Sequence, residues 1–421
     1  MFKKITLENG LRLILISQKE SLSTAILVLV EAGSKYEVKE INGISHFLEH
    51  MCFKGTKRRP KPMDIWSELD NMGGISNAFT SFEYTGYYAK VRPNHLENAL
   101  DLLSDIYINQ LFDPGEIERE KGVIIEEINM TNDDPPRKVW DEFINLLYGD
   151  QPAGWDIAGP KENIKKMTRE DLIKYHDANY VAESTLVVIA GKFDELKIIE
   201  DVKKYFANIS RNLKAGKVKV AEHQEKPEVR VIFKETDQTH LIMGIRAFDI
   251  FDERKYALEV LADILGGGFS SRLFQKIRVQ MSAAYYVGSD ASLFTDHGFL
   301  GISAGLDNQK VDDVLRVILE ELERLVRELV TEEELKRAKE HLTGQLILSL
   351  ETSNQLAGFF GSQEILEHKI ITPEELVAKI QAVTSEQIKE VAKEIMENKN
   401  LNLALIGPFK EKERFEKILK L

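Results

Sequence analysis

The stretch Thr168-Arg169-Glu170-Asp171-Leu172, followed by an apolar run and Gly191, occurs a second time in this chain. Its counterpart is Thr384-Ser385-Glu386-Gln387-Ile388, which is again followed by an apolar run and by Gly407. Thr168 and Thr384 are 216 positions apart, and so are Gly191 and Gly407. Equal offsets without a gap indicate that the chain consists of two homologous halves.

The two halves predict two tandem domains of the α+β class. A chain of 421 residues is longer than one hydrophobic core usually supports. In each half, strand patterns precede long helical patterns, which favours a largely antiparallel sheet with helices packed on one face. We expect an N-terminal domain at 1–210, a polar linker at 211–227 and a C-terminal domain at 228–421, with the two domains forming a clamp.

Within the first half, the stretch His46-Phe47-Leu48-Glu49-His50 predicts a metal site. Residues four apart lie on one face of a helix, so His46 and His50 can bind a single ion through ring nitrogens. Glu49 shares this face, and its carboxylate can take a proton from water that zinc has acidified. The order HxxEH is that of the inverted zincins. The second half has no HxxEH at the corresponding position near 256–265, so we expect it to supply substrate contacts instead.

Composition excludes several other classes of function. Hydrophobic residues make up 43% and charged residues 30% of the chain, as in soluble globular proteins. A formal net charge of -13 disfavours a nucleic-acid partner, which needs a basic face. The apolar run at 24–30 is too short for a membrane span, and the first residues lack the apolar region of a secretory signal. The single cysteine, Cys52, fits a reducing compartment, and we expect a cytoplasmic protein.

A catalytic zinc usually has three protein ligands, so a third is expected downstream. The acidic helical pattern at 116–130 offers several carboxylates. Glu120 and Glu127 are seven positions apart and share a helix face, while Glu126 lies about 100° from Glu127 around the helix. Helical geometry alone leaves both Glu126 and Glu127 open as the third ligand.

Together, these residues resemble the pitrilysin/insulinase family of inverted zinc peptidases, and most closely its processing-peptidase branch, to which mitochondrial processing peptidase belongs. In the family pattern, one glutamate follows the second histidine by 70 positions and a ligand glutamate comes seven positions later. These positions are Glu120 and Glu127 in this chain. The resemblance implies one zinc ion per chain, held by His46, His50 and Glu127. It also implies that Glu120 orients a ligand histidine.

The segment Asn77-Ala78-Phe79-Thr80 extends the resemblance, because it is similar to an exposed edge strand of that family. A peptide adds to such a strand through backbone hydrogen bonds. The resemblance implies that the Asn77 side chain and the Ala78 backbone hold the substrate main chain, with Phe79 beside them.

In the second half, Arg278 and Tyr285 are seven positions apart and follow a glycine-rich stretch at 266–274, like a pair of residues in the same family. The resemblance implies that the Tyr285 hydroxyl donates to the developing oxyanion and that Arg278 holds a substrate carbonyl. Tyr286 takes the place of Tyr285 if the register shifts by one position.

The sequence therefore predicts a zinc metalloendopeptidase that hydrolyses peptides or unfolded protein segments in a closed chamber. Glu49 is the expected base, and residues of the second half are expected to complete the site. We expect a homodimer, with a heterodimer containing a homologous inactive chain as the alternative. The competing hypothesis is a noncatalytic subunit of a processing-peptidase-like complex, against which the intact ligand set argues.

Overall fold

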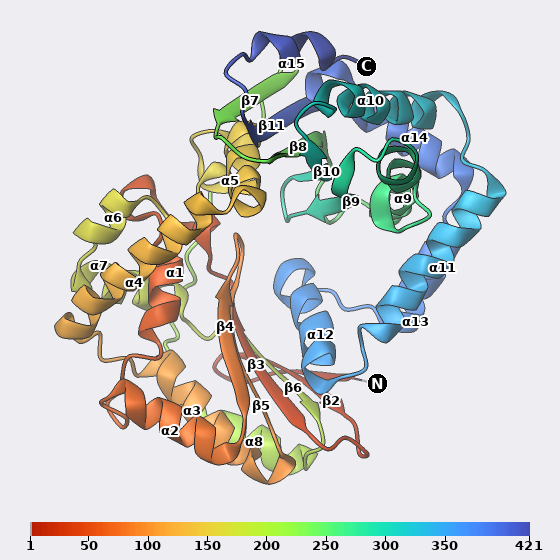
Figure 1. Ribbon diagram of the computed structural model, residues 1–421. Coiled ribbons are helices and arrows are strands. Elements are labelled where there is room, and N and C mark those ends of the chain that lie inside the picture. Colours follow the sequence, from red (N-terminus) through yellow and green to blue (C-terminus); the bar gives the residue numbers. More distant parts are fainter. Residues whose placement is uncertain (1) are drawn as a thin grey trace. The chain divides into compact units, whose positions relative to one another are not determined.

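The computed structural model describes residues 2–421, which fold into two compact units (Figure 1). Unit 1 contains the described residues up to Asn129 together with Trp155–Val218 and Ser349–Ile370. Unit 2 contains Met130–Gly154, Lys219–Leu348 and Ile371–Leu421. Each unit has its own β-sheet and its own hydrophobic core.

The sheet of unit 1 has the strand order β1-β2-β6-β3-β5-β4. All neighbouring strands are antiparallel except β2 and β6, which are parallel. Strands β3 and β6 are buried along their whole length, as expected for continuous hydrophobic runs at the centre of a sheet. The strands are β1 (Phe2–Thr6), β2 (Arg12–Ser17), β3 (Thr24–Val30), β4 (Ile75–Thr80), β5 (Thr85–Val91) and β6 (Thr185–Gly191).

Most helices of unit 1 pack on the face of the sheet that carries Leu13, Val28 and Val187. The helix with the HxxEH stretch, α1 (Ile44–Met51), is among them. The long α4 begins in unit 1 and ends just beyond the unit boundary. The other helices are η1 (Ser34–Tyr36), η2 (Lys39–Ile41), α2 (Pro62–Met72), η3 (Pro93–His95), α3 (Leu96–Ile108), α4 (Pro114–Asp133), α6 (Lys161–Lys166), α7 (Arg169–Asn179) and α8 (Glu195–Tyr205).

The opposite face of this sheet is covered by α12 (Ser353–Glu367), which comes from the second half of the chain (Figure 1). Ala357 and Phe360 of α12 pack in one cluster with Leu27 and Val188 of the sheet. Buried ion pairs also hold α12: Arg12 of β2 lies 3.3 Å from Glu364 and 2.5 Å from Glu31. A buried carboxylate and guanidinium each need such a partner.

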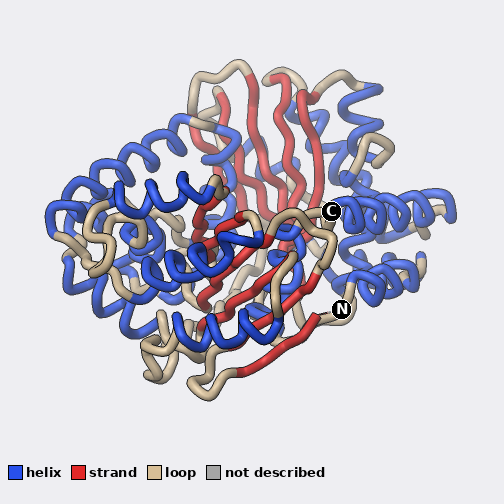
Figure 2. The backbone as a smooth tube through the Cα atoms, turned by 90° about the horizontal axis from the view of Figure 1, so that it is seen from below, coloured by secondary structure: helices blue, strands red, loops and turns tan. Residues whose placement is uncertain are grey.

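The sheet of unit 2 repeats the arrangement of unit 1, with the strand order β7-β11-β8-β10-β9. This order corresponds to β2-β6-β3-β5-β4, and the one parallel pair, β7 with β11, matches β2 with β6. Within each sheet, neighbouring strands lie side by side, with helices along them (Figure 2). The strands are β7 (Glu228–Phe233), β8 (Gln238–Ala247), β9 (Ala284–Leu293), β10 (Gly298–Asp307) and β11 (Leu401–Gly407).

In unit 2, a helix from the first half of the chain covers the second face of the sheet. This helix is α5 (Pro135–Tyr148), whose Phe143 ring lies directly against Gly244 of β8. The other face carries the core of unit 2. The remaining helices are η4 (Pro152–Gly154), α9 (Lys255–Ala262), η5 (Asp263–Gly267), η6 (Phe274–Gln280), α10 (Val311–Arg327), α11 (Glu332–Leu348), α13 (Pro373–Ala382), α14 (Ser385–Ile395), η7 (Asn398–Asn400) and α15 (Glu413–Ile418).

The repeated stretch of sequence is a helix start followed by a central strand. The hydroxyl of Thr168 accepts a hydrogen bond from the Asp171 backbone N–H at the start of α7, and Thr384 does the same with Gln387 at the start of α14. Both sites are capping boxes, in which the acidic or amide side chain accepts in return from the threonine N–H. The strands that follow, β6 and β11, occupy equivalent places in the two sheets.

The α+β class and the duplicated topology are confirmed. The expected linker at 211–227 contains neither helix nor strand, and the unit boundary between Val218 and Lys219 falls inside it. Two segments depart from the expected domain limits, because α5 joins unit 2 and α12 joins unit 1. Helices therefore lie on both faces of each sheet, since the strands at its centre are apolar on both faces.

Over residues 2–421, no helix is both long enough and apolar enough to cross a membrane.

Candidate metal centre

Helix α1 is held at its start by a buried carboxylate. Glu37 accepts hydrogen bonds of 2.8 Å from the backbone N–H groups of Gly43 and Ser45 and from the side chain of Asn42. These N–H groups have no partner within the helix, and the positive end of the helix dipole favours a negative charge there. Burial raises the pKa of Glu37 to about 7, although the same hydrogen bonds act in the opposite direction.

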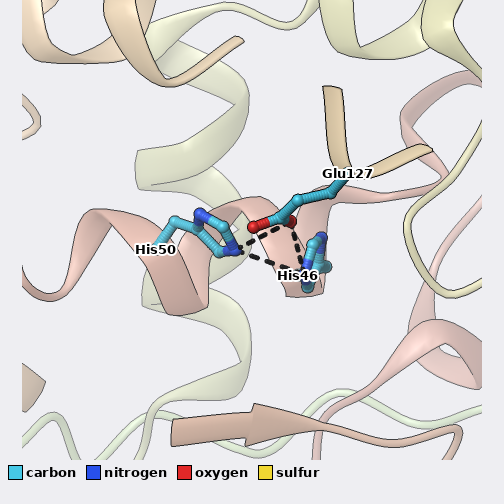
Figure 3. A group of neighbouring side chains, drawn as sticks. All are labelled: His46, His50 and Glu127. Atoms are coloured by element: carbon cyan, nitrogen blue, oxygen red, sulfur yellow. Dashed lines mark hydrogen bonds and ion pairs between the residues drawn. The ribbon is translucent and has the colours of Figure 1, made fainter. Parts of the chain in front are cut away.

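The amphipathic pattern of α1 decides where its histidines lie. Ile44, Phe47 and Leu48 are buried in the core of unit 1. His46 and His50 lie on another side of the helix, where they face Glu127 of α4 (Figure 3).

The three predicted ligands converge on one point. His46 Nε2 and His50 Nε2 are 3.2 Å apart, and Glu127 Oε2 lies 3.6 Å from His46 Nε2 and 3.5 Å from His50 Nε2 (Figure 3). Two ligands bound about 2.0–2.1 Å from a tetrahedral zinc ion are separated by roughly 3.3 Å. Two imidazole nitrogens and one carboxylate oxygen at this spacing therefore fit zinc. Each of the three residues offers one ligand atom.

The protonation of His46 also suits a metal ligand. Burial, followed by the neighbouring charge of His50, lowers the pKa of His46 to about 3. The imidazole is therefore neutral at physiological pH, as a metal ligand must be.

Glu120 holds His50 from the side opposite the ligand atom. Its Oε1 lies 2.8 Å from His50 Nδ1, and its Oε2 lies 2.6 Å from the ammonium of Lys54. Burial by itself raises the pKa of Glu120, but the hydrogen bonds to His50 and Lys54 outweigh it and lower the pKa. For His50, burial lowers the pKa, and the hydrogen bond to Glu120 with the charges of Glu127 and Glu49 raises it overall. An ionised Glu120 fixes Nδ1 as the protonated nitrogen and leaves Nε2 for a metal.

Glu49 lies beside the ligand group and contacts strand β4. The Thr80 hydroxyl donates a 2.5 Å hydrogen bond to Glu49 Oε2. Burial raises the pKa of Glu49, which the bond from Thr80 and the charge of His50 partly offset. A carboxylate with a raised pKa is a stronger base than an ordinary one and is suited to proton transfer near neutral pH.

Strand β4 is at the edge of its sheet, paired only with β5 among the described strands. The Ala78 N–H points away from β5 and donates a 2.9 Å hydrogen bond to the Asn77 side chain. Asn77 is exposed, and Phe79 packs edge-on against Tyr84 with the ring centroids 5.8 Å apart. Unpaired backbone groups on such an edge can bind a further strand.

Arg278 and the two tyrosines belong to unit 2. Arg278 is exposed on η6, with its guanidinium 5.5 Å from the Phe274 ring centroid. Tyr285 is 60% exposed on β9, the strand equivalent to β4. Tyr286 faces the other side of β9, where its hydroxyl lies 3.0 Å from His240 Nδ1. This contact engages the Tyr286 hydroxyl and favours Tyr285 as the residue whose hydroxyl can meet a ligand.

Helical geometry left both Glu126 and Glu127 as candidates for the third ligand. In the structure, the side chain near the histidines is that of Glu127. Glu127 joins the two histidines, whereas Glu126 is exposed and outside the ligand group. The sequence did not indicate the contacts of Glu37, Lys54 and Thr80 at this site. No local spacing links Glu37 or Thr80 to the HxxEH stretch, because their contacts depend on a loop and on a neighbouring strand.

Comparison with known families now adds to this geometry. The model described as Insulinase (Peptidase family M16) matches residues 12–161, and the model described as Peptidase M16 inactive domain matches residues 166–342. This chain belongs to peptidase family M16. The family predicted from the sequence is thus confirmed, and the "inactive" description of the second M16 model agrees with the absence of HxxEH from the second half.

Similar proteins and solved structures match nearly the whole chain. A Bacillus subtilis (strain 168) protein described as the uncharacterized zinc protease YmxG is 38% identical, over 97% of this chain and 98% of its own. The crystal structure of a Helicobacter pylori protease has a TM-score of 0.91 at 24% identity and covers 97% of this chain and 99% of its own. A chain of Complex III2 from Candida albicans has a TM-score of 0.85 at 17% identity, and the match covers 100% of each chain, so the two chains share a fold.

Replacement of the third ligand tests the metal centre. Glu127→Gln keeps the size of the side chain but loses the charge and one oxygen donor. Loss of a direct ligand costs more than loss of an outer contact, so we expect zinc affinity to fall by more than about 100-fold. Glu126→Gln, one residue away and exposed, is the matched control and should leave the affinity unchanged. Competition with a chromophoric chelator measures both affinities, and equal weakening by both variants would contradict the assignment.

The buried cap on α1 predicts a dependence of stability on pH. The folded-state pKa of Glu37, about 7, is higher than the ordinary value of 4.5, so its contribution to stability is full below pH 4.5 and is lost as the pH rises through 7. Glu37→Gln lacks this dependence. As the pH rises from 4.5 to 7.5, the wild type should therefore lose up to about 3 kcal/mol of unfolding free energy that the variant keeps.

Urea unfolding of the metal-free proteins across this pH range measures the difference. Glu40→Gln, which alters an exposed carboxylate three positions later, is the control and should follow the wild type. A stability difference between Glu37→Gln and the wild type that is constant with pH would show that Glu37 has no raised pKa in the folded state.

Proposed function

We propose that this chain is a zinc-dependent metalloendopeptidase that hydrolyses peptides or unfolded protein segments. The observation that carries the proposal is the convergence of His46, His50 and Glu127 at zinc-ligand spacing, with Glu49 directly beside them. Membership of family M16 and the description of the Bacillus subtilis relative as a zinc protease support the same activity. We propose one zinc ion per chain, because a single ligand group of this kind is found among the described residues.

Zinc, when bound, supplies Lewis acidity that polarises the scissile carbonyl and acidifies the attacking water. Glu49 takes the proton from this water and passes it to the departing amine. The Thr80 hydroxyl, 2.5 Å from Glu49, holds the carboxylate in a fixed direction during both transfers. Glu120 keeps His50 in the orientation that presents Nε2.

The substrate binds as an additional strand on β4. This mode of binding requires an extended segment with free backbone groups, which a peptide or an unfolded region offers and a folded protein does not. The Asn77 side chain accepts a hydrogen bond from the Ala78 N–H, and a substrate carbonyl would take its place at this position. Asn77 is then free to hold the substrate main chain.

The role of Glu49 is tested by Glu49→Gln. The amide cannot accept the proton, so kcat should fall by about 10²–10⁴-fold. Zinc content should stay at the wild-type value, because Glu49 is not a ligand. Both quantities are measured on the same preparation, by peptide hydrolysis and by elemental analysis. Full activity in this variant would favour a different base, and loss of zinc together with activity would contradict the assigned role.

The role of the exposed tyrosine is tested separately. If Tyr285 donates to the oxyanion in the transition state, Tyr285→Phe lowers kcat by about 10²–10³-fold with little change in KM. Tyr286→Phe loses a hydroxyl that already contacts His240 and should have a smaller effect on kcat. The reverse order of effects in peptide-hydrolysis assays would assign the role to Tyr286. The contact of Arg278 with a substrate carbonyl stays a prediction.

Association of the chain and its location are further proposals. An intact ligand group with Glu49, Arg278 and Tyr285 in one chain supports an active homodimer that needs no second gene product, in which peptide is hydrolysed within a closed chamber. An inactive monomer that a homologous partner restores to activity would instead support the processing-peptidase-like heterodimer. Sedimentation of the purified chain alongside activity measurements distinguishes them. The cytoplasm stays the predicted location.

A further inference from the structure

Unit 1 contains an apolar cavity on the face of the sheet opposite the metal centre. Its volume is about 210 Å³, and it lies between α12 and the strands β3, β5 and β4. Leu27, Leu29, Phe79, Tyr88 and Ala357 contribute to its walls, and none of the residues that line it is charged. An apolar cavity of about 150 Å³ is large enough to bind benzene. The cavity therefore has room for a leucine or phenylalanine side chain.

Two glycines of α12 determine the shape of this cavity. A Cβ atom at Gly361 would lie 3.0 Å from Leu29 and 3.3 Å from Leu27, so the helix packs closely on the sheet at this point. A Cβ atom at Gly358 would meet no atom within 4 Å. Asn354, Gly358 and Ser362 are spaced four apart on one side of α12, and all three line the cavity. Gly358 thus leaves open the space that a larger residue would fill.

Strand β4 connects the cavity with the metal centre. Successive residues of a strand point to opposite faces of the sheet. Thr80 reaches Glu49 on the metal side, and Phe79, its neighbour, lines the cavity on the other side. A peptide paired with β4 must divide its side chains between the same two faces.

One cross-strand row leads from the open edge of β4 to the cavity. Asn77 lies opposite Tyr88 of β5, and Tyr88 lies opposite Leu27 of β3, all on the cavity face. The neighbouring row is closed, because the Phe79 ring occupies the space above Gly86. Asn77 is exposed, so a peptide side chain opposite it can extend over this short residue toward Tyr88.

We propose that this cavity is a specificity pocket for a bulky apolar side chain of the substrate strand, at the position opposite Asn77. The inference rests on the proposed peptidase activity and on peptide addition to β4. The uncharged walls and the aromatic rings of Phe79, Tyr84 and Tyr88 select phenylalanine, leucine or methionine over charged residues. The enzyme therefore prefers substrates with such a residue at a fixed distance from the cleaved bond.

Filling the cavity from α12 tests the proposal. Gly358→Leu places a side chain in the open space and is compatible with a helix. Gly344→Leu is the matched control, since Gly344 is also a helical glycine, on α11, with no atom within 4 Å of its Cβ position. The substrates are fluorogenic peptides of alanine and glycine in which one phenylalanine is moved along the sequence by one position at a time.

In the wild type, phenylalanine at one position should raise kcat/KM for cleavage relative to the all-small peptide. Gly358→Leu should reduce this preference by about 10–100-fold, and Gly344→Leu should keep the preference. Zinc content and circular dichroism of the variants verify that the fold and the metal centre are intact.

The two proposals fail in different ways. Wild-type enzyme that contains zinc and cleaves no peptide of the series overturns the proposed peptidase activity, and the pocket assignment with it. Wild-type enzyme that cleaves the peptides, combined with an unchanged phenylalanine preference in Gly358→Leu, overturns the pocket alone. A loss of activity in Gly358→Leu that is equal for every peptide also overturns it, because a filled specificity pocket discriminates between substrates.

Discussion

Burial of the apolar side of α1 against the sheet of unit 1 is the constraint on which the metal centre depends. Ile44, Phe47 and Leu48 can leave water only in one orientation of the helix, and this orientation turns His46 and His50 toward α4. The carboxylate of Glu37 then fixes the first turn from within the core. The spacing of the three candidate ligands thus depends on packing within unit 1, and such packing reduces the cost of organising a site.

In the proposed mechanism, strand β4 has the matching role on the substrate side. Its open edge would offer backbone groups to a peptide, Thr80 contacts Glu49 on one face, and Phe79 lines an apolar cavity on the other. In unit 2 the same place in the sheet is taken by β9, which carries Tyr285, while the helix equivalent to α1 lacks the ligands. The duplicated halves thus form two similar frameworks, and the candidate ligand group lies on one of them.

The sequence was sufficient for the duplicated α+β topology, because the repeated stretch encodes a capping box and a central strand in each half. It was also sufficient for the ligand pair on α1, since helical spacing is a local property. Local spacing could not decide between Glu126 and Glu127, which required the family pattern and then the packing of α4. Local patterns also could not predict which sheet α5 and α12 cover, because each packs on a sheet formed largely by the other half of the chain. They could not predict the contacts of Glu37 and Thr80 either, because these contacts join different elements. The fully apolar runs of β3 and β6 were the one available sign that both faces of the sheet are covered.

Metal-dependent hydrolysis by the purified chain tests the central claim most directly. An unstructured peptide mixture is incubated with the protein, zinc content is determined, and a chelator is added before zinc is restored. The account predicts about one zinc ion per chain and cleavage that the chelator abolishes and zinc restores. Peptide cleavage that persists when the chain has been stripped of metal, or a chain that binds no zinc at all, would contradict the account.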